Sequence, residues 1–257
     1  MVPTEVADAL PELVPFLRAV QQRRPDDGTW CEGWTVRDVL AHQAGNAEEL
    51  ARVLRAVLVG APVETRGFTR EAPYRRMSDA ELWTAFTSRC AELTEVASAA
   101  ASDLAPETEI GWTGRTVTVP FFLEHLREEL VMHRWDLTGD DRTATAALDE
   151  PWMTRHTVLS VGRPLLVKGA AGLGIGPGGS PVEGRLRVPG TDDVLVTADA
   201  EGVSIGFAAA DGPATIESDA ATRVLLLWGR RPADPTRWHS SAGPEALVRF
   251  RNLLGGY

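Results

Sequence analysis

The chain has 257 residues, of which 44% are hydrophobic, so it is long enough for one large domain or two modest domains with packed cores. Its formal net charge is −10 at pH 7, which argues against a broad nucleic-acid surface, because phosphate binding needs clustered lysine and arginine. No stretch approaches the roughly 18–20 consecutive apolar residues of a membrane span. The composition therefore predicts a globular protein that has no nucleic-acid or membrane partner.

The start of the chain and its cysteines favour the cytoplasm. No apolar run follows a basic start, so we expect no signal peptide. The two cysteines, Cys31 and Cys90, are expected to be thiols rather than a disulfide, because the cytosol keeps thiols reduced. The sequence thus predicts a cytoplasmic protein and leaves both a monomer and a homodimer open.

Four helices are predicted in the first half of the chain. The first three have apolar residues at spacings of three and four, which place one stripe of a helix in a core. Thr35 and Asp38 have the spacing of a capping box, in which two residues at the helix start bond each other's backbone N–H. Ser78 and Glu81 repeat this spacing, and Pro120 suits the first turn of a helix. The predicted helices cover residues 4–23, 35–59, 78–102 and 118–137.

Two connections between these helices have distinct compositions. Residues 61–77 contain proline, glycine and arginine and are predicted to be a loop. Residues 110–119 alternate around Gly114, which predicts a short hairpin or an extended loop. We expect these two segments, together with an interdomain cleft, to determine which substrate is chosen.

The composition changes after about residue 145. A glycine-rich stretch, residues 169–180, lacks the Lys-Ser/Thr ending of a phosphate loop, so nucleotide binding is discounted. Apolar runs separated by turn residues predict three strands and a possible fourth, while Asp219 and Pro244 begin helices. The predicted helices are 151–167, 220–231 and 244–254, and the strands are 185–190, 193–198, 202–208 and 214–217. The fold class is therefore α+β, with a four-helix bundle over residues 1–145 followed by an α+β domain over residues 146–257.

The helix over residues 118–137 carries the candidate site. A helix advances 100° per residue, so Glu129, His133 and Asp136 project from one face, and His125 lies one turn earlier on it. Imidazoles and carboxylates in one stripe are costly to bury unless they are hydrogen-bonded, paired or bound to a metal, and a divalent ion would bind them. A further ligand must come from another helix, and His42 is the best candidate. Nitrogen and oxygen donors suit zinc, and three ligands would leave a coordination position open for chemistry.

Each of these residues also has an explanation that involves no function. Glu and His four residues apart on a helix are common, and most such pairs are solvated or bond each other. His125 is either a fourth ligand, a proton carrier or a packed neighbour. Asp136 is predicted to be catalytic, as a base or as a group that orients a metal-bound water, because it shares the face of the ligands; the alternative is that it pairs with Arg134 or solvent.

Two motifs resemble the mycothiol-dependent maleylpyruvate isomerase family, which belongs to the DinB-like metal-binding four-helix bundles. They are W-T-V-R-D-V-L-A-H-Q-A-G and E-E-L-V-M-H-R-W-D. The family pattern is a histidine ending V-x-D-h-x-x-H, where h is apolar, and then E-x-x-x-H-R-x-D on the last bundle helix. The resemblance implies that His42, Glu129 and His133 bind a divalent metal, by preference zinc, and that Asp136 is the pattern's aspartate.

The resemblance extends past the bundle. The stretches L-L-L-W-G-R-R and P-E-A-L-V-R-F are similar to the family's sterol-carrier-like C-terminal domain. Arg230 matches the arginine of its W-G-R pattern, which implies a catalytic role such as clamping a carboxylate of the substrate or thiol. Its alternative role is that of a cation near a helix C-terminus, where it is favourable to the helix dipole.

The resemblance implies a metal-dependent enzyme that uses mycothiol or another low-molecular-weight thiol. A metal-activated thiolate would attack a small electrophilic substrate, giving either an isomerase or a mycothiol S-transferase. One alternative is a metal-dependent hydrolase that uses bound hydroxide. The other is a non-catalytic module that binds a small ligand and holds the metal only for structure.

Overall fold

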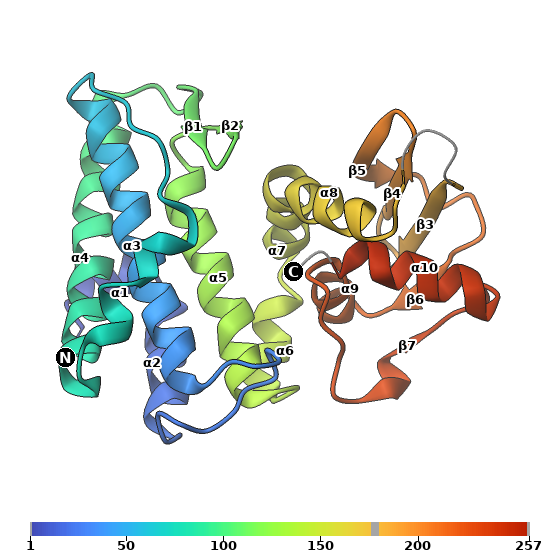
Figure 1. The fold of residues 1–257 in the computed structure, drawn as a ribbon, viewed down its shortest axis with the longest axis horizontal. Helices are drawn as coiled ribbons and strands as arrows, with labels where there is room; N and C mark the ends of the chain where they lie inside the picture. The colour runs from blue at the N-terminus through green and yellow to red at the C-terminus, as the bar shows by residue number, and fades with distance from the viewer. Residues whose placement is uncertain (1, 176–179, 256–257) are drawn as a thin grey trace. The chain divides into compact units, whose positions relative to one another are not determined.

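The computed structural model describes residues 2–175 and 180–255, which form two compact units (Figure 1). The first unit is Met1–Thr138 and the second is Gly139–Tyr257. The predicted domain boundary after residue 145 falls inside helix α6 (Arg142–Leu148), which packs on helix α9 (Ala220–Leu227), and it stays a prediction. Residues 176–179 of the predicted glycine-rich loop lie outside the described residues.

The first unit is a bundle of long helices, as the sequence predicts. Leucine, valine and phenylalanine side chains such as Phe16, Leu50 and Phe86 are fully buried in its core. Thr35 and Ser78 accept hydrogen bonds from the backbone N–H groups of Asp38 and Glu81, so both predicted capping boxes are confirmed. The helices are α1 (Thr4–Ala9), α2 (Leu13–Gln21), α3 (Val36–Leu58), α4 (Asp79–Asp103) and α5 (Phe121–Thr138).

Proline explains where two helix predictions in this unit differ from the structure. The predicted helix over residues 4–23 is divided, because Leu10 precedes Pro11 and takes a non-helical conformation (φ −126°, ψ 70°). The predicted start at Thr118 is three residues early, since α5 begins directly after Pro120. The position of the α5 face that carries the candidate site is unchanged by this shift.

Both connecting segments of the first unit acquire short secondary structure. The predicted loop over residues 61–77 contains the 3₁₀ helices η1 (Gly67–Glu71) and η2 (Tyr74–Arg76), which pack against α3. The predicted hairpin is confirmed, with β1 (Ile110–Trp112) antiparallel to β2 (Arg115–Val117). Its turn contains Gly114 at φ 76°, a left-handed conformation that glycine adopts without strain.

The second unit contains a five-stranded sheet in the order β5-β4-β3-β6-β7. Neighbouring strands are antiparallel except β3 and β6, which are parallel. The three predicted strands and the possible fourth are present, and the α+β class is confirmed. The strands are β3 (Val182–Arg187), β4 (Asp193–Asp199), β5 (Gly202–Ala208), β6 (Ile216–Ser218) and β7 (Trp238–His239).

The helices of the second unit are shorter than α3, α4 and α5 of the bundle. The predicted helix over residues 151–167 is interrupted by a π-helical turn, Thr157–Val161, because Pro164 lacks an N–H and its ring crowds the carbonyl four residues earlier. The helices are α7 (Pro151–His156), α8 (Gly162–Gly172), α9 (Ala220–Leu227), α10 (Pro244–Leu254) and the 3₁₀ helix η4 (Pro235–Arg237). Within the described residues of both units, no helix is long and apolar enough to cross a membrane.

Candidate metal centre

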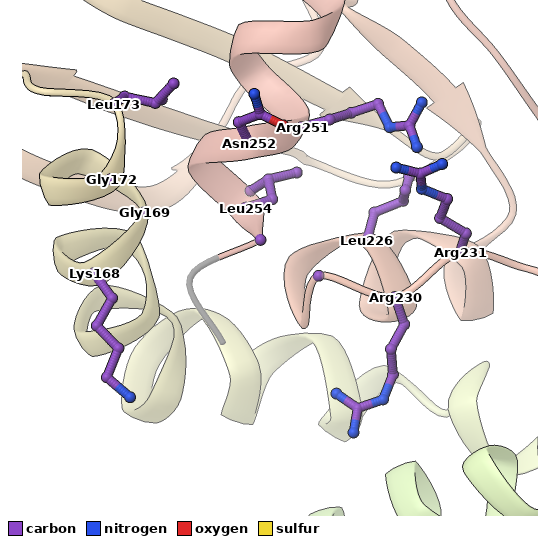
Figure 2. Close-up of a pocket in the computed structure, with 12 residues that line it drawn as sticks. Lys168, Gly169, Gly172, Leu173, Leu226, Arg230, Arg231, Arg251, Asn252 and Leu254 are labelled. Atoms are coloured by element: carbon purple, nitrogen blue, oxygen red, sulfur yellow. The ribbon is translucent and has the colours of Figure 1, made fainter. Parts of the chain in front are cut away.

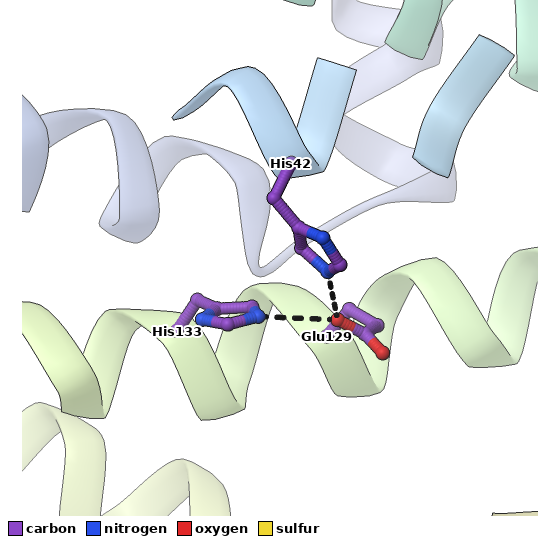
Figure 3. A group of neighbouring side chains, drawn as sticks. All are labelled: His42, Glu129 and His133. Carbon is purple, nitrogen blue, oxygen red and sulfur yellow. Dashed lines mark hydrogen bonds and ion pairs between the residues drawn. The ribbon is translucent and has the colours of Figure 1, made fainter. Parts of the chain in front are cut away.

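Three predicted ligands from two helices meet inside the bundle. His42 projects from α3, while Glu129 and His133 project from α5 one turn apart (Figure 3). The Nε2 atoms of His42 and His133 lie 3.2 Å and 3.3 Å from the same oxygen, Oε2 of Glu129. All three side chains are buried, and one candidate donor atom from each lies within 4.8 Å of the others. We name these residues the trio.

The trio fits a divalent metal ion in both spacing and chemistry. Ligand atoms around a tetrahedral zinc ion, with bonds of about 2.0–2.1 Å, are separated by about 3.3 Å. The two separations between donor atoms match that value. Two imidazole nitrogens and one carboxylate oxygen are also a donor set that zinc accepts, with room for a further ligand.

A carboxylate backs each histidine of the trio. Glu71 Oε1 lies 2.7 Å from Nδ1 of His42, and Asp136 Oδ2 lies 2.8 Å from Nδ1 of His133. In metalloproteins such a carboxylate holds the proton on the outer nitrogen and leaves the inner nitrogen free to coordinate. Both histidines are therefore oriented with Nε2 toward Glu129.

The contacts within the trio shift two pKa values in opposite directions. Burial by itself would raise the pKa of Glu129, but the contacts with His133 and His42 outweigh it and hold that pKa well below its usual range. Burial would lower the pKa of His133, but the carboxylates of Asp136 and Glu129 raise it. Glu129 is therefore an anion inside the bundle, and the carboxylates of Asp136 and Glu129 favour the positively charged form of His133.

Glu71 is a functional candidate that the sequence did not reveal. It lies on η1, in a segment predicted only as loop, and contacts a histidine 29 positions away. No motif or apolar period marks it. Its other oxygen accepts a hydrogen bond from Arg75 at 2.8 Å, so the outer carboxylate is itself held in place.

Two more side chains border the trio. The ring of Trp34 is stacked on His133, with ring centres 5.7 Å apart and planes 9° apart. His125 Nε2 lies 3.7 Å from the second oxygen of Glu129, and its ring is stacked on Phe121. His125 thus contacts the oxygen that faces away from the other two histidines, and the alternatives of a fourth ligand, a proton carrier and a packed neighbour all stay open.

Arg230 lies in the second unit, immediately after α9. Its guanidinium donates to the carbonyl oxygen of Trp228 at 3.2 Å. With Lys168, Arg231 and Arg251 it lines a cavity of about 480 Å³ (Figure 2). The structure places it in a cationic pocket of its own unit, and its predicted catalytic role stays a prediction.

Comparisons with known proteins agree with this architecture. The model of the mycothiol maleylpyruvate isomerase N-terminal domain family matches residues 6–138. Two solved structures share the fold with a TM-score of 0.59, namely a mycothiol-dependent maleylpyruvate isomerase at 19% identity and a point mutant of such an enzyme at 17%. Each alignment covers 94% of this chain and 94% of the other. No match is found among curated proteins.

Proposed function

We propose that this chain, which belongs to the mycothiol maleylpyruvate isomerase family, is a metal-dependent enzyme that uses mycothiol or another low-molecular-weight thiol on a small electrophile. The observation that carries the proposal is the trio, His42, Glu129 and His133, with a carboxylate behind each histidine. Such backing is typical of metal sites, in which the outer hydrogen bond orients the ligand.

Each residue of the centre has a distinct task in this proposal. The trio would hold the ion, and Glu71 and Asp136 would act as positioning residues that keep both Nε2 atoms directed at it. A divalent ion would supply the positive charge that lets a thiol ionise near neutral pH. Because the trio is buried, little water would compete with the thiol for the open coordination position of the ion.

The thiolate would react with an electron-poor double bond. A carbon–sulfur bond forms at one alkene carbon, and the electron pair of the π bond moves toward the activating group. The remaining single bond rotates, the electron pair returns and the thiolate leaves, which gives cis–trans isomerisation with the thiol regenerated. If the carbon instead takes a proton before the sulfur leaves, the product is a thioether and the reaction is a thiol transfer.

The experiment that tests the proposal measures metal and thiol on one sample. Elemental analysis of purified protein should give about one zinc per chain, as a single site implies, and a titration should show saturable mycothiol binding. His42→Ala should lose the metal, the thiol binding and the turnover while the helical content is retained. His239→Gln is the matched control, because His239 is mostly exposed and lies in the second unit.

Three results would count against the proposal. Stoichiometric metal in His42→Ala would refute the ligand assignment. Metal without thiol binding in the unmodified protein would favour a metal-dependent hydrolase. Absence of metal after reconstitution would leave a ligand-binding module as the better explanation.

A further inference from the structure

We propose that the cavity of the second unit that contains Arg231 and Arg251 binds the phosphate group of a small molecule, at a site that shares no residue with the trio. The inference goes beyond the proposed function, which is carried by residues of the first unit. It depends on a cavity that is lined by cations without an acidic residue, on two guanidinium groups without a counter-charge, and on the way guanidinium bonds phosphate.

The cavity lies where the ends of α9 and α10 meet α8 (Figure 2). Its volume of about 480 Å³ is in the range of small-molecule sites. Lys168 and three arginines line it and no acidic residue does, although the chain as a whole has a net charge of −10. Positive charge gathered in one cavity of an acidic protein favours the binding of an anion there.

The end of α9 directs Arg231 and Arg230 to different places. Gly229 ends the helix in a left-handed conformation, φ 71°. An added Cβ atom at Gly229 would come within 3.1 Å of the Leu254 carbonyl oxygen, so this turn lies against the end of α10. Beyond it, Arg230 and Arg231 point in opposite directions, and the guanidinium of Arg231 is directed toward that of Arg251 (Figure 2). The proposed site therefore rests on Arg231 and Arg251 and not on Arg230.

Arg231 and Arg251 have no counter-charge within the described part of the chain. No described carboxylate oxygen lies within 4.0 Å of either guanidinium, and Nη2 of Arg251 is buried without a hydrogen-bond partner among the described residues. The guanidinium carbon of Arg251 lies 5.7 Å from the ring centre of Trp238, which holds the side chain without neutralising it. By contrast, Arg187 of the same unit bonds Asp193 at 2.7 Å. Like charges repel and buried donors are nearly always bonded, so this pair has both the charge and the donors to bind an anion.

Phosphate matches this pair better than a carboxylate does. A phosphate monoester carries a charge of about −1.5 to −2 near pH 7 and has three terminal oxygens, so it can neutralise and bond both guanidinium groups. A carboxylate has one charge and two oxygens, which satisfy one guanidinium. Leu226 and Leu254 also line the cavity and provide an apolar wall for the organic part of a phosphorylated molecule.

The test is a calorimetric titration of purified protein with inorganic phosphate at low ionic strength. We expect saturable binding that is weakened about ten- to a hundredfold in Arg231→Gln, the range for a lost hydrogen bond to a charged group. Arg251→Gln should weaken it as much. Arg231 is exposed, so its variant still tests the site if Arg251→Gln fails to fold. Phenyl phosphate should bind more tightly than inorganic phosphate, and succinate, a dicarboxylate, more weakly.

Arg249→Gln is the matched control. Arg249 lies on the same helix as Arg251, donates to the Ser180 carbonyl oxygen at 2.6 Å and does not line the cavity, so its variant should bind phosphate like the unmodified protein. Equal phosphate affinity in Arg231→Gln and unmodified protein would overturn the inference, as would the absence of phosphate binding at millimolar concentration. Succinate binding as tight as that of phosphate would refute the ligand class.

A further variant separates this site from the trio. Phosphate binding that is lost in His42→Ala but kept in Arg231→Gln would place the anion on the metal of the trio and would overturn the inference. We expect the reverse, with phosphate binding kept in His42→Ala. Metal content and thiol binding are measured in other experiments, so failure of the proposed function is distinguished from failure of this site.

Discussion

Two buried glutamates of the same bundle have very different surroundings. Glu49 on α3 accepts hydrogen bonds from Arg52 at 2.8 Å and from the Nε and backbone N–H of Arg66 at 2.5 and 2.6 Å. Glu129 on α5 has three ion-pair partners among the described residues, all of them histidines, and a hydrogen bond from Gln43.

Glu49 is paired with arginines and Glu129 with histidines, and these two residue types differ in whether they can release their positive charge. Arginine is always charged, so the negative charge of Glu49 is neutralised permanently within the chain. Histidine is often neutral near pH 7 and then offers a lone pair. In the proposed site the histidines would give up their protons when an ion takes over the positive charge, which the arginines at Glu49 cannot do. Burial of a carboxylate by itself does not separate a structural ion pair from a metal site, and the histidine partners of Glu129 are what support the proposed metal site.

The largest expected effect is the loss of metal in Glu129→Gln. This change removes the anionic ligand, so zinc per chain should fall from about one to near zero. The free energy of unfolding of metal-free protein should change by less than about 1 kcal/mol or increase, because a buried charge without an arginine partner is removed. Elemental analysis measures the zinc content, and unfolding of chelator-treated protein measures the free energy of unfolding without metal. If Glu129→Gln keeps its zinc, Glu129 is not a metal ligand and does not differ from Glu49 in this respect.

Glu49→Gln should lower the stability of the protein and leave its zinc content unchanged. It leaves Arg52 and Arg66 without their buried carboxylate, so the free energy of unfolding should fall by about 2–4 kcal/mol while zinc content stays unchanged. Urea unfolding measures the loss. The exposed Glu95→Gln is the control and should stay within about 0.5 kcal/mol of the unmodified protein. Zinc loss in Glu49→Gln would show that the two carboxylates are not independent.

Asp136→Asn and Glu71→Gln should have a smaller effect on the same centre. Each change removes the carboxylate behind one histidine, so zinc affinity should fall about 10- to 100-fold with the trio itself intact. Competition with a chelator measures the affinity. Asp79→Asn, which breaks a surface ion pair with Arg37, provides the control. Unchanged affinity in both variants would remove the outer carboxylates from the model of the site.

The smallest expected effect is a pH dependence of the Glu49 ion pair. Burial would raise the pKa of Glu49, but hydrogen bonds from Arg52 and Arg66 lower it below its usual 4.5. A lowered folded-state pKa gives stabilisation that is complete above the unfolded-state value and is lost as pH falls through the folded-state value. The difference in unfolding free energy between unmodified protein and Glu49→Gln should therefore shrink below about pH 5. A constant difference would contradict this.

Most elements could be predicted because their signals are local. Capping pairs such as Thr35 and Asp38 are three residues apart, and the bonds they predict are made within one helical turn. The errors also have local causes, since Pro11 and Pro164 interrupt helices that apolar spacing alone would continue. Glu129 and His133 share a helix face for the same reason, so two of the three residues of the trio were visible in one short motif.

Local sequence patterns were enough to predict most of the helices, four of the five sheet strands and the one-turn spacing of Glu129 and His133, because these depend on residues a few positions apart. Only the tertiary structure decided that His42 meets Glu129 across 87 positions and that Glu71 backs His42 across 29. Such contacts arise from the packing of α3, η1 and α5, and no local propensity encodes which side chains that packing brings together.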